Sequence, residues 1–370
     1  MPRRRRGGLR GQGATKDIIM KDACILIDGS MGEGGGQVLR ASLALSMSLG
    51  KPFRISKIRA NRPKPGLKRQ HLTCVKAAQA ICGATVDGEA INSSNLFFAP
   101  GAVCPGEYEF HVGTGGSVTM VLQALMPPLL LGTTPSRLTV TGGTHVPYAP
   151  PFEFMRDTLF PRLETLGVRL SARMDRVGYM DIGGGSVTVD IQPVAEPAPF
   201  HQGEAGAWEG TEATIYGHNL PEGIVEREID VLLSEEHASL GLTPETIRRE
   251  DGAAPARSIA GAGNMVLVAV RHGRHTTVFG ECGWRGRTAE VVARQACKRA
   301  LIFIRAGMPI EAHLADQLLV PLALAGGGSF VTERISPHTR TCLAVIEQFM
   351  GKQKVMLSPT ETKGTRITLT

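Results

Sequence analysis

Hydrophobic and polar positions along the chain follow a pattern that occurs three times. In each copy, a Leu/Ala-rich helix is followed by a short β-strand, an amphipathic helix and further β-rich sequence. The two helices of each copy are predicted at 37–50 and 69–82, at 117–132 and 150–167, and at 313–326 and 337–350. Helices on one side of a sheet bury only one of its faces, so three such units are expected to pack their helices together.

Residues 196–303 lie between the second and third copies and do not follow this pattern. They contain an amphipathic helix, a hairpin pattern and a second long helix, enough for a small α+β domain. We therefore predict an α/β (α+β) fold with a large domain formed by residues 23–195 and 304–370, interrupted by a smaller domain at 196–303.

Positive charge is concentrated in two segments, although the net charge of the whole chain is only +7. Residues 1–22 are rich in Arg and Gly, lack apolar periodicity, and are predicted to form a disordered basic tail. Residues 54–71 hold seven Lys or Arg and no acidic residue. Local positive charge of this kind is typical of a surface that receives a polyanion.

The remaining composition indicates a protein of a reducing compartment, which we predict to be the cytoplasm. The seven cysteines are odd in number and never spaced CxxC, which argues against a disulfide framework and a zinc site. Four of them fall in helical patterns and are predicted to be core residues: Cys74, Cys82, Cys297 and Cys342. The longest apolar run, MVLQALMPPLLLG, is too short to span a membrane, so no membrane partner is predicted.

The segment SPHTRTCLAVIEQF predicts a helix that begins with a histidine in its first turn. Ser336 fits the N-cap, Pro337 the first helical position, and His338 follows directly. Free N–H groups and the helix dipole attract an anion there and disfavour imidazolium. We therefore expect a neutral, nucleophilic ring beside a phosphate site; the alternative is a histidine that only packs or hydrogen-bonds.

Two further segments join strands to helices and carry phosphate-binding chemistry. DGSMGEGGGQVLR is glycine-rich but is not a Walker A loop, and Glu33 within it is suited to hold Mg²⁺ against phosphate oxygens. KIRANRPKPGLKRQH offers basic groups for phosphates, with Gln70 and His71 able to read a ribose hydroxyl or a terminal phosphate. Aromatic residues are not interleaved with these basic groups, which favours recognition of an RNA end over stacking along a strand. For the glycine-rich segment, the alternative is a turn needed only for tight helix packing. For the basic segment, the alternative is a solvated loop.

The segment HLADQ begins the first helix of the third copy, predicted at 313–326. Its Asp316 and Gln317 can bond sugar hydroxyls and its His313 can stack on a base, unless His313 and Asp316 merely cap the helix.

These motifs, together with GGTHVPYAPP, occur in an order that closely resembles the RNA 3′-terminal phosphate cyclases over about residues 24–370. The resemblance implies three βαβαββ-type repeats with an inserted domain. It also implies ATP-dependent conversion of an RNA 3′-phosphate end to a 2′,3′-cyclic phosphodiester, with release of AMP and pyrophosphate and with Mg²⁺ or Mn²⁺ as the metal.

The same resemblance assigns roles to individual residues of this chain. His338 is the histidine that becomes adenylylated, and Glu33 is the metal-associated glutamate. The ATP positions are Gln123, Pro150, His313, Leu314, Ala315, Asp316 and Gln317. The groups that receive phosphates are Arg40, on the ATP side, and Arg59, Arg62, Gln70 and His71, on the RNA side. Some members have Tyr where this chain has His313.

Two other functions fit parts of this sequence. A non-catalytic cyclase-like ribosome-assembly factor would keep the fold and the basic surface, but it could dispense with His338. A small-molecule transferase similar to the enolpyruvyl transferases would share the repeat architecture, but HLADQ and SPH fit adenylylation better.

Overall fold

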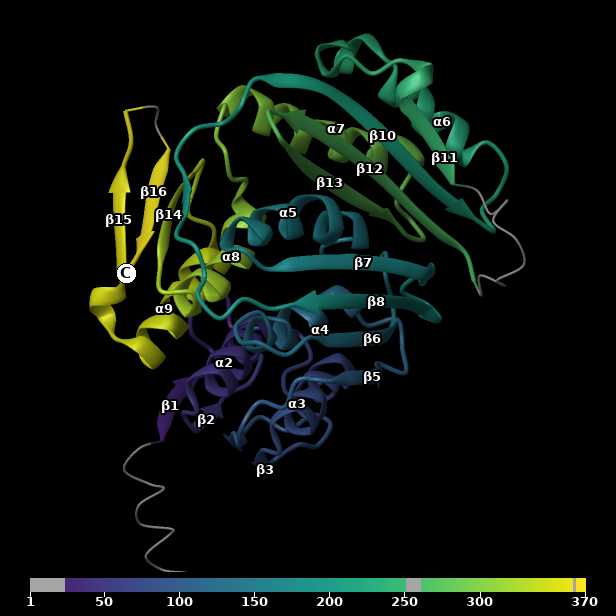
Figure 1. The fold of residues 1–370 in the computed structure, drawn as a ribbon. Helices are drawn as coiled ribbons and strands as arrows, with labels where there is room; N and C mark the ends of the chain where they lie inside the picture. Colours follow the sequence, from purple (N-terminus) through teal and green to yellow (C-terminus); the bar gives the residue numbers. More distant parts are fainter. Residues whose placement is uncertain (1–23, 251–260, 362–363) are drawn as a thin grey trace, which may run out of the picture.

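The computed structural model of the chain describes residues 24–250, 261–361 and 364–370. The predicted disordered tail, residues 1–22, lies outside the described residues. Within the described ranges, three four-stranded sheets share one strand arrangement, and a fourth sheet belongs to a separate inserted unit (Figure 1).

The first repeat sets the arrangement that the other two follow. Its elements are β1 (Ile25–Asp28), α2 (Gly36–Leu49), β2 (Phe53–Ser56), α3 (Arg69–Cys82), β3 (Thr85–Asp87) and β4 (Leu96–Ala99). The strand order is β1-β2-β4-β3, with β1 and β2 parallel and the other pairs antiparallel. Gly50 and Gly83 end the two helices in the left-handed conformation, which a residue without Cβ adopts at little cost.

The second repeat has the equivalent strand order β5-β6-β8-β7. Its elements are β5 (Glu107–His111), α4 (Val118–Leu125) with a 3₁₀ turn η1 (Pro127–Leu129), β6 (Ser136–Gly142), η2 (Phe154–Leu159), α5 (Phe160–Leu163), the 3₁₀ turn η3 (Glu164–Leu166), β7 (Arg169–Arg176) and β8 (Gly185–Gln192). The helix predicted over 150–167 is thus divided, and η2 is a π-helix. Pro161 lacks the N–H that a continuous α-helix needs there.

The third repeat is completed by a strand that precedes the inserted unit. Its elements are β9 (Phe200–Gln202), α8 (Ala312–Leu324), β14 (Gly328–Thr332), α9 (Pro337–Met350), the 3₁₀ turn η6 (Lys352–Lys354), β15 (Val355–Pro359) and β16 (Thr365–Leu369). β9 pairs in parallel with β14, giving the order β9-β14-β16-β15. The predicted boundary at residue 196 lies before β9, although β9 belongs to the sheet of the third repeat. The sequence does not reveal β9, because a three-residue strand is too short to show a hydrophobic pattern.

The inserted unit follows β9 and ends before α8. Its elements are β10 (Trp208–His218), α6 (Ile224–Leu232), the 3₁₀ turns η4 (Glu235–Leu240) and η5 (Pro244–Thr246), β11 (Ile247–Glu250), β12 (Gly263–His272), β13 (His275–Gly283) and α7 (Ala289–Ala306). The strand order is β11-β10-β12-β13, and α7 packs against α6, β12 and β13. The N–H of Val278 on β13 donates to Thr158 Oγ1 at 2.9 Å, which ties the unit to η2.

The repeats bury their helices against one another. α2 lies in the centre and contacts α3, α4, α8 and α9, and Figure 1 shows these helices gathered between the sheets. One hydrophobic cluster runs through all three repeats, and a second fills the inserted unit. This arrangement confirms the predicted fold class and brings the starts of α2, α3, α8 and α9 toward one region.

Two predictions about composition can be compared with the structure. All seven cysteines lie in the described ranges and are free thiols, and the four predicted to be core residues are buried. No helix in these ranges is both long enough and apolar enough to span a membrane.

Candidate active site

A cleft of about 770 Å³ lies where the repeats and the inserted unit meet. The predicted site residues that line it are Glu33, Arg40, Arg59, Arg62, Gln70, His71, Pro150, His313, Asp316, Gln317 and His338. Gln123 lies next to the cleft and accepts a hydrogen bond from Arg40. Leu314 and Ala315 are fully buried on α8 and do not line it.

His338 occupies the first turn of α9, as the sequence predicts. The Ser336 side chain accepts a hydrogen bond from the Thr339 N–H at 3.0 Å, and Pro337 is the first helical residue. Because Ser336 accepts a hydrogen bond from one N–H of the first turn, the N-terminus of α9 is fixed, and the imidazole lies in the cleft.

Glu33 connects the glycine-rich loop to this histidine. Glu33 Oε2 lies 3.2 Å from His338 Nε2 and 2.9 Å from the guanidinium of Arg62. The Glu33 N–H donates to Thr341 Oγ1 at 3.2 Å, so the loop is also held by α9. Gly32, with a φ of +58°, lies against Thr341 so closely that a Cβ would collide with it. The loop therefore needs glycine to bring Glu33 to His338.

The protonation of His338 differs from the sequence prediction. The hydrogen bond to Glu33 raises the pKa of His338 above its ordinary value, although burial acts in the opposite direction. Burial is the largest single influence on Glu33 and raises its pKa. His338 and Arg62 together nevertheless bring the pKa of Glu33 below its ordinary value. The effect on the pKa is therefore opposite in direction to the one expected from the helix dipole, because a carboxylate distant in sequence favours the imidazolium.

Replacing Glu33 with glutamine is expected to lower the pKa of His338, because the partner of the imidazolium loses its charge. The protonated pair stabilises the fold fully below the ordinary histidine pKa, and this contribution is lost as the pH rises through the raised value. Imidazole NMR titration of wild type and Glu33→Gln measures the shift. Asp28→Asn removes a nearby carboxylate that pairs with Lys57 instead and is the control. An equal pKa of His338 in the wild type and in Glu33→Gln would contradict the conclusion that Glu33 raises this pKa.

Arg40 is held under the cleft by two glutamines. Arg40 Nε donates to Gln123 Oε1 at 2.9 Å, and its Nη2 donates to Gln37 Oε1 at 2.7 Å. Asp316 is also buried, which raises the pKa of its carboxyl to about 6, and its Oδ1 accepts a hydrogen bond from Gln317. These groups place one cation and a row of hydrogen-bonding side chains on the floor of the cleft.

Gln70 and His71 join the basic segment to the second repeat. Gln70 Oε1 accepts from the Ser117 N–H at 2.9 Å. Burial, assisted by Arg40 and Arg59, lowers the pKa of His71 to about 3, so its ring is neutral. His71 Nδ1 accepts from the Lys68 N–H at 3.4 Å, which leaves the proton on Nε2. His71 is therefore a hydrogen-bond donor toward the cleft.

The inserted unit contributes residues that sequence reasoning missed. Glu281 bonds both Arg287 at 2.9 Å and Arg299 at 3.2 Å, and Arg299 also approaches His313 Nδ1 at 3.4 Å. No motif in the sequence identifies them, because Glu281 and Arg287 lie around the end of β13 and Arg299 lies on α7, outside the repeat pattern. They form a charged wall facing the third repeat.

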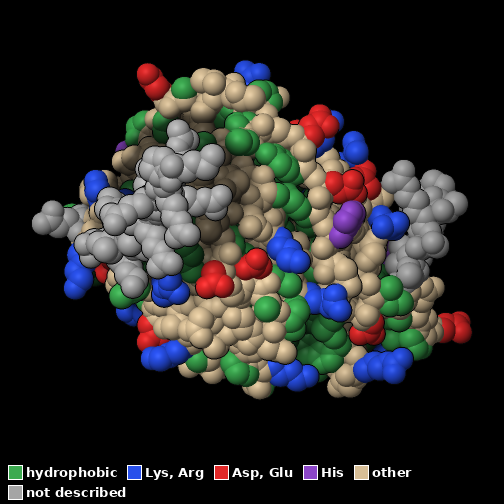
Figure 2. Space-filling view, turned by 90° about the horizontal axis from the view of Figure 1, so that it is seen from below, with side chains coloured by type: hydrophobic (Ala, Val, Ile, Leu, Met, Phe, Trp, Pro, Cys, Tyr) green, Lys and Arg blue, Asp and Glu red, His purple; other side chains and the backbone are tan. Residues whose placement is uncertain are grey.

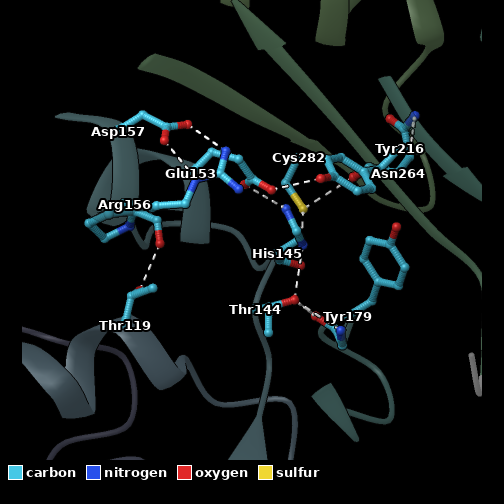
Figure 3. A network of polar contacts seen from close by, with 12 residues as sticks. Thr119, Thr144, His145, Glu153, Arg156, Asp157, Tyr179, Tyr216, Asn264 and Cys282 are labelled. Atoms are coloured by element: carbon cyan, nitrogen blue, oxygen red, sulfur yellow. Dashed lines mark hydrogen bonds and ion pairs between the residues drawn. The ribbon is translucent and has the colours of Figure 1, made fainter. Parts of the chain in front are cut away.

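A buried polar network fixes the loop between β6 and η2, which forms another wall of the cleft (Figure 3). His145 Nε2 lies 2.9 Å from Glu153 Oε2, and the Tyr216 hydroxyl donates to Glu153 Oε1 at 2.7 Å. The Thr119 hydroxyl donates to the Pro150 carbonyl at 2.7 Å. Since Tyr216 belongs to β10, the network also attaches the inserted unit to the second repeat.

Positive charge is gathered inside the cleft. Its described lining holds five arginines and three carboxylates, with Arg287 and Arg299 supplied by the inserted unit. On the face shown in Figure 2, by contrast, Lys and Arg are interspersed with Asp and Glu among the described residues. The cleft, more than this face, is suited to phosphate groups.

A divalent cation in this cleft would have few protein ligands. The described residues hold no cluster of three or more His, Cys, Asp or Glu side chains that could bind a metal. The Glu33 carboxylate, whose side chain is 14% exposed, lies beside an arginine and a histidine and has no second carboxylate in contact with it within the part of the chain that the structure describes. This fits Mg²⁺, which commonly binds through one or two carboxylates and takes its other ligands from phosphates and water.

Comparisons with known proteins agree with the family that the motifs resemble. A model of the RNA 3′-terminal phosphate cyclase family matches residues 31–355. An RNA 3′-terminal phosphate cyclase of Koribacter versatilis (strain Ellin345) is 44% identical over 326 residues, covering 88% of this chain and 90% of that protein. An RNA 3′-terminal phosphate cyclase of Ectopseudomonas mendocina (strain ymp) is 41% identical over 351 residues, covering 94% of this chain and 97% of that protein. A third, of Ralstonia nicotianae (strain ATCC BAA-1114 / GMI1000), is 41% identical over 328 residues, covering 88% of this chain and 92% of that protein.

Proposed function

The chain belongs to the RNA 3′-terminal phosphate cyclase family, and we propose that it converts RNA 3′-phosphate ends to 2′,3′-cyclic phosphodiesters with ATP through a His338–AMP intermediate. This is a ligase-type nucleotidyl transfer that releases AMP and pyrophosphate. The observation that carries the proposal is the position of His338, at a helix start inside an arginine-lined cleft and bonded to Glu33.

His338 is the nucleophile toward the α-phosphate of ATP. Attack requires a neutral ring, whereas the bond to Glu33 favours the protonated one. A proton held by the pair is therefore released to water before a ring nitrogen with a free lone pair forms the N–P bond and the P–O bond to pyrophosphate breaks. Glu33 fixes the ring through Nε2 and would also hold Mg²⁺ or Mn²⁺, which neutralises charge on phosphate oxygens when bound. The N–H groups at the start of α9 stabilise negative charge near the same atoms.

The ATP side of the cleft is assigned to α8 and its neighbours. Asp316 and Gln317 bond the sugar hydroxyls, and His313 and Pro150 contact the base. Arg40, positioned by Gln123, faces the phosphates. Leu314 and Ala315 support these groups by packing α8 into the core.

The RNA end is assigned to the basic segment. Arg59, Arg62, Gln70 and His71 face the cleft and offer donors to the 3′-phosphate and its ribose. The phosphate takes AMP from His338 and becomes an anhydride; the neighbouring 2′-OH then attacks the phosphorus and expels AMP. A well-oriented intramolecular attack is worth roughly 7–11 kcal/mol, so positioning accounts for much of that step.

The test uses ATP labelled in the α-phosphate, with Mg²⁺, first without RNA and then with a 3′-phosphate oligoribonucleotide. We expect acid-labile label on the wild-type protein, which is lost as a cyclic 3′ end and AMP appear. A 3′-hydroxyl oligonucleotide, which has no phosphate to activate, is the control. A folded wild-type protein that takes no label would contradict the proposal and favour a non-catalytic RNA-binding role.

A further inference from the structure

Two exposed aromatic side chains meet at the cleft although they are far apart in the sequence. The chain has only two Trp and four Tyr, and Tyr148 and Trp284 both line the cleft, with ring centroids 6.2 Å apart. Tyr148 comes from the loop after β6 and Trp284 from the turn after β13. Tyr148 is 90% exposed and Trp284 is 39% exposed, so the pair lies at the open edge of the cleft.

Trp284 is held in place by an arginine. The Arg287 guanidinium lies 4.5 Å from the centre of the Trp284 ring, within the range of a cation–π contact. Arg287 is itself fixed, because it donates to the Cys282 carbonyl at 2.8 Å and to Glu281 Oε2 at 2.9 Å. Part of the indole is therefore covered by a fixed cation, and the rest is exposed to solvent. An exposed ring held in this way is suited to stack on a planar ligand.

Tyr148 is held in a backbone conformation that tyrosine seldom adopts. Its φ is +62°, in the left-handed region, and such strain persists only where the surroundings impose it. The surroundings here are the bond from Thr119 to the Pro150 carbonyl and the His145–Glu153 pair before and after the loop (Figure 3). The buried anchors thus hold an almost fully exposed ring at the edge of the cleft, where it gains little from packing.

We propose that Tyr148 and Trp284, with Arg287, form a platform on which bases next to the RNA 3′ end stack. The inference rests on the proposed function and adds a subsite to it. Aromatic rings and arginine planes bind the bases of single strands without requiring a particular sequence. His338 and the two rings line the same cleft, so a strand whose 3′ end lies at His338 can extend over the rings.

The platform is tested with oligoribonucleotides of equal length that carry a 3′-phosphate and lack one base, at the last or the second-to-last position. The wild type should lose roughly 5- to 100-fold in apparent affinity for one of these abasic ends, the usual range for one stacked base. Trp284→Ala and Tyr148→Ala should bind the complete oligonucleotide correspondingly worse and should no longer distinguish it from the abasic one. Trp208→Ala is the matched control, because Trp208 is also exposed but lies away from the cleft.

Self-adenylylation by ATP without RNA separates this inference from the proposed function. The platform variants should form the adenylate as the wild type does, while their KM for RNA rises. A wild-type protein without adenylate would refute the proposed function. Normal adenylate together with unchanged discrimination against abasic ends would refute only the platform.

Fluorescence gives an independent measurement of the same contact. In a Trp208→Phe protein, Trp284 is the single tryptophan, and its emission should be quenched by a 3′-phosphate oligoribonucleotide. Equal quenching by ATP alone would assign the rings to the nucleotide of the first step and overturn the proposal.

Discussion

Replacing His338 with alanine is expected to abolish transfer of AMP to the protein and, with it, cyclisation of RNA ends. Loss of an enzyme's nucleophile typically lowers the rate by about 10⁴-fold or more, because binding and electrostatic stabilisation alone cannot supply the covalent step. The fold should persist, since the His338 side chain is 38% exposed and Ser336 still caps α9. Label from α-³²P-ATP and the yield of cyclic ends measure the two losses.

The matched control is His201→Ala. His201 is exposed on β9, also in the third repeat, and bonds Ser329 away from the cleft. It should keep wild-type labelling. A His338→Ala protein that still takes acid-labile label would mean that another residue accepts AMP, and the assignment of the nucleophile would be wrong.

Replacing Glu153 with alanine is expected to reduce the free energy of unfolding by about 2–5 kcal/mol, because the buried His145 and Tyr216 side chains each lose a hydrogen-bond partner, at about 1–3 kcal/mol each. Burial, the largest single influence, raises the pKa of Glu153, but His145 and the Tyr216 hydroxyl bring it below its ordinary value. The stabilisation is therefore present above the ordinary carboxyl pKa and is lost as the pH falls through the lowered value. Denaturant unfolding at neutral and acid pH measures both effects.

Asp157→Ala is the control for this loss. Asp157 lies in η2, four residues after Glu153, and pairs with Arg156 at 2.6 Å, but both side chains are partly exposed. An exposed pair contributes at most about 1 kcal/mol. Equal destabilisation by the two substitutions would show that the buried network does not hold the inserted unit to the second repeat.

The parts of the fold and site that the sequence predicts are those with local causes. Ser336 and Pro337 fix the start of α9 through their own backbone preferences, so His338 could be placed before any tertiary contact was known. The helix and strand order of the repeats follows in the same way from short-range hydrophobic spacing. The structure bears out this level of prediction.

The parts that could not be predicted depend on contacts between distant segments. Glu33 reaches His338 only because α2 and α9 pack together, and that contact reverses the expected effect on the imidazole. The sequence shows no aromatic residues interleaved with the basic segment, yet Tyr148 and Trp284 meet at the cleft that this segment also lines. Tertiary proximity of this kind leaves no local pattern.

The position of β9 has a consequence for the order of folding. Ser329 of β14 lies opposite His201 of β9, and the two residues are 128 positions apart, whereas the first sheet pairs strands that lie close together in sequence. Contacts of high sequence separation form slowly, and domains tend to form as they emerge during synthesis. The third sheet, and with it the attachment of α9, is therefore expected to be the last to assemble. The cleft that His338 lines would therefore be complete only after β15 and β16 have joined the third sheet.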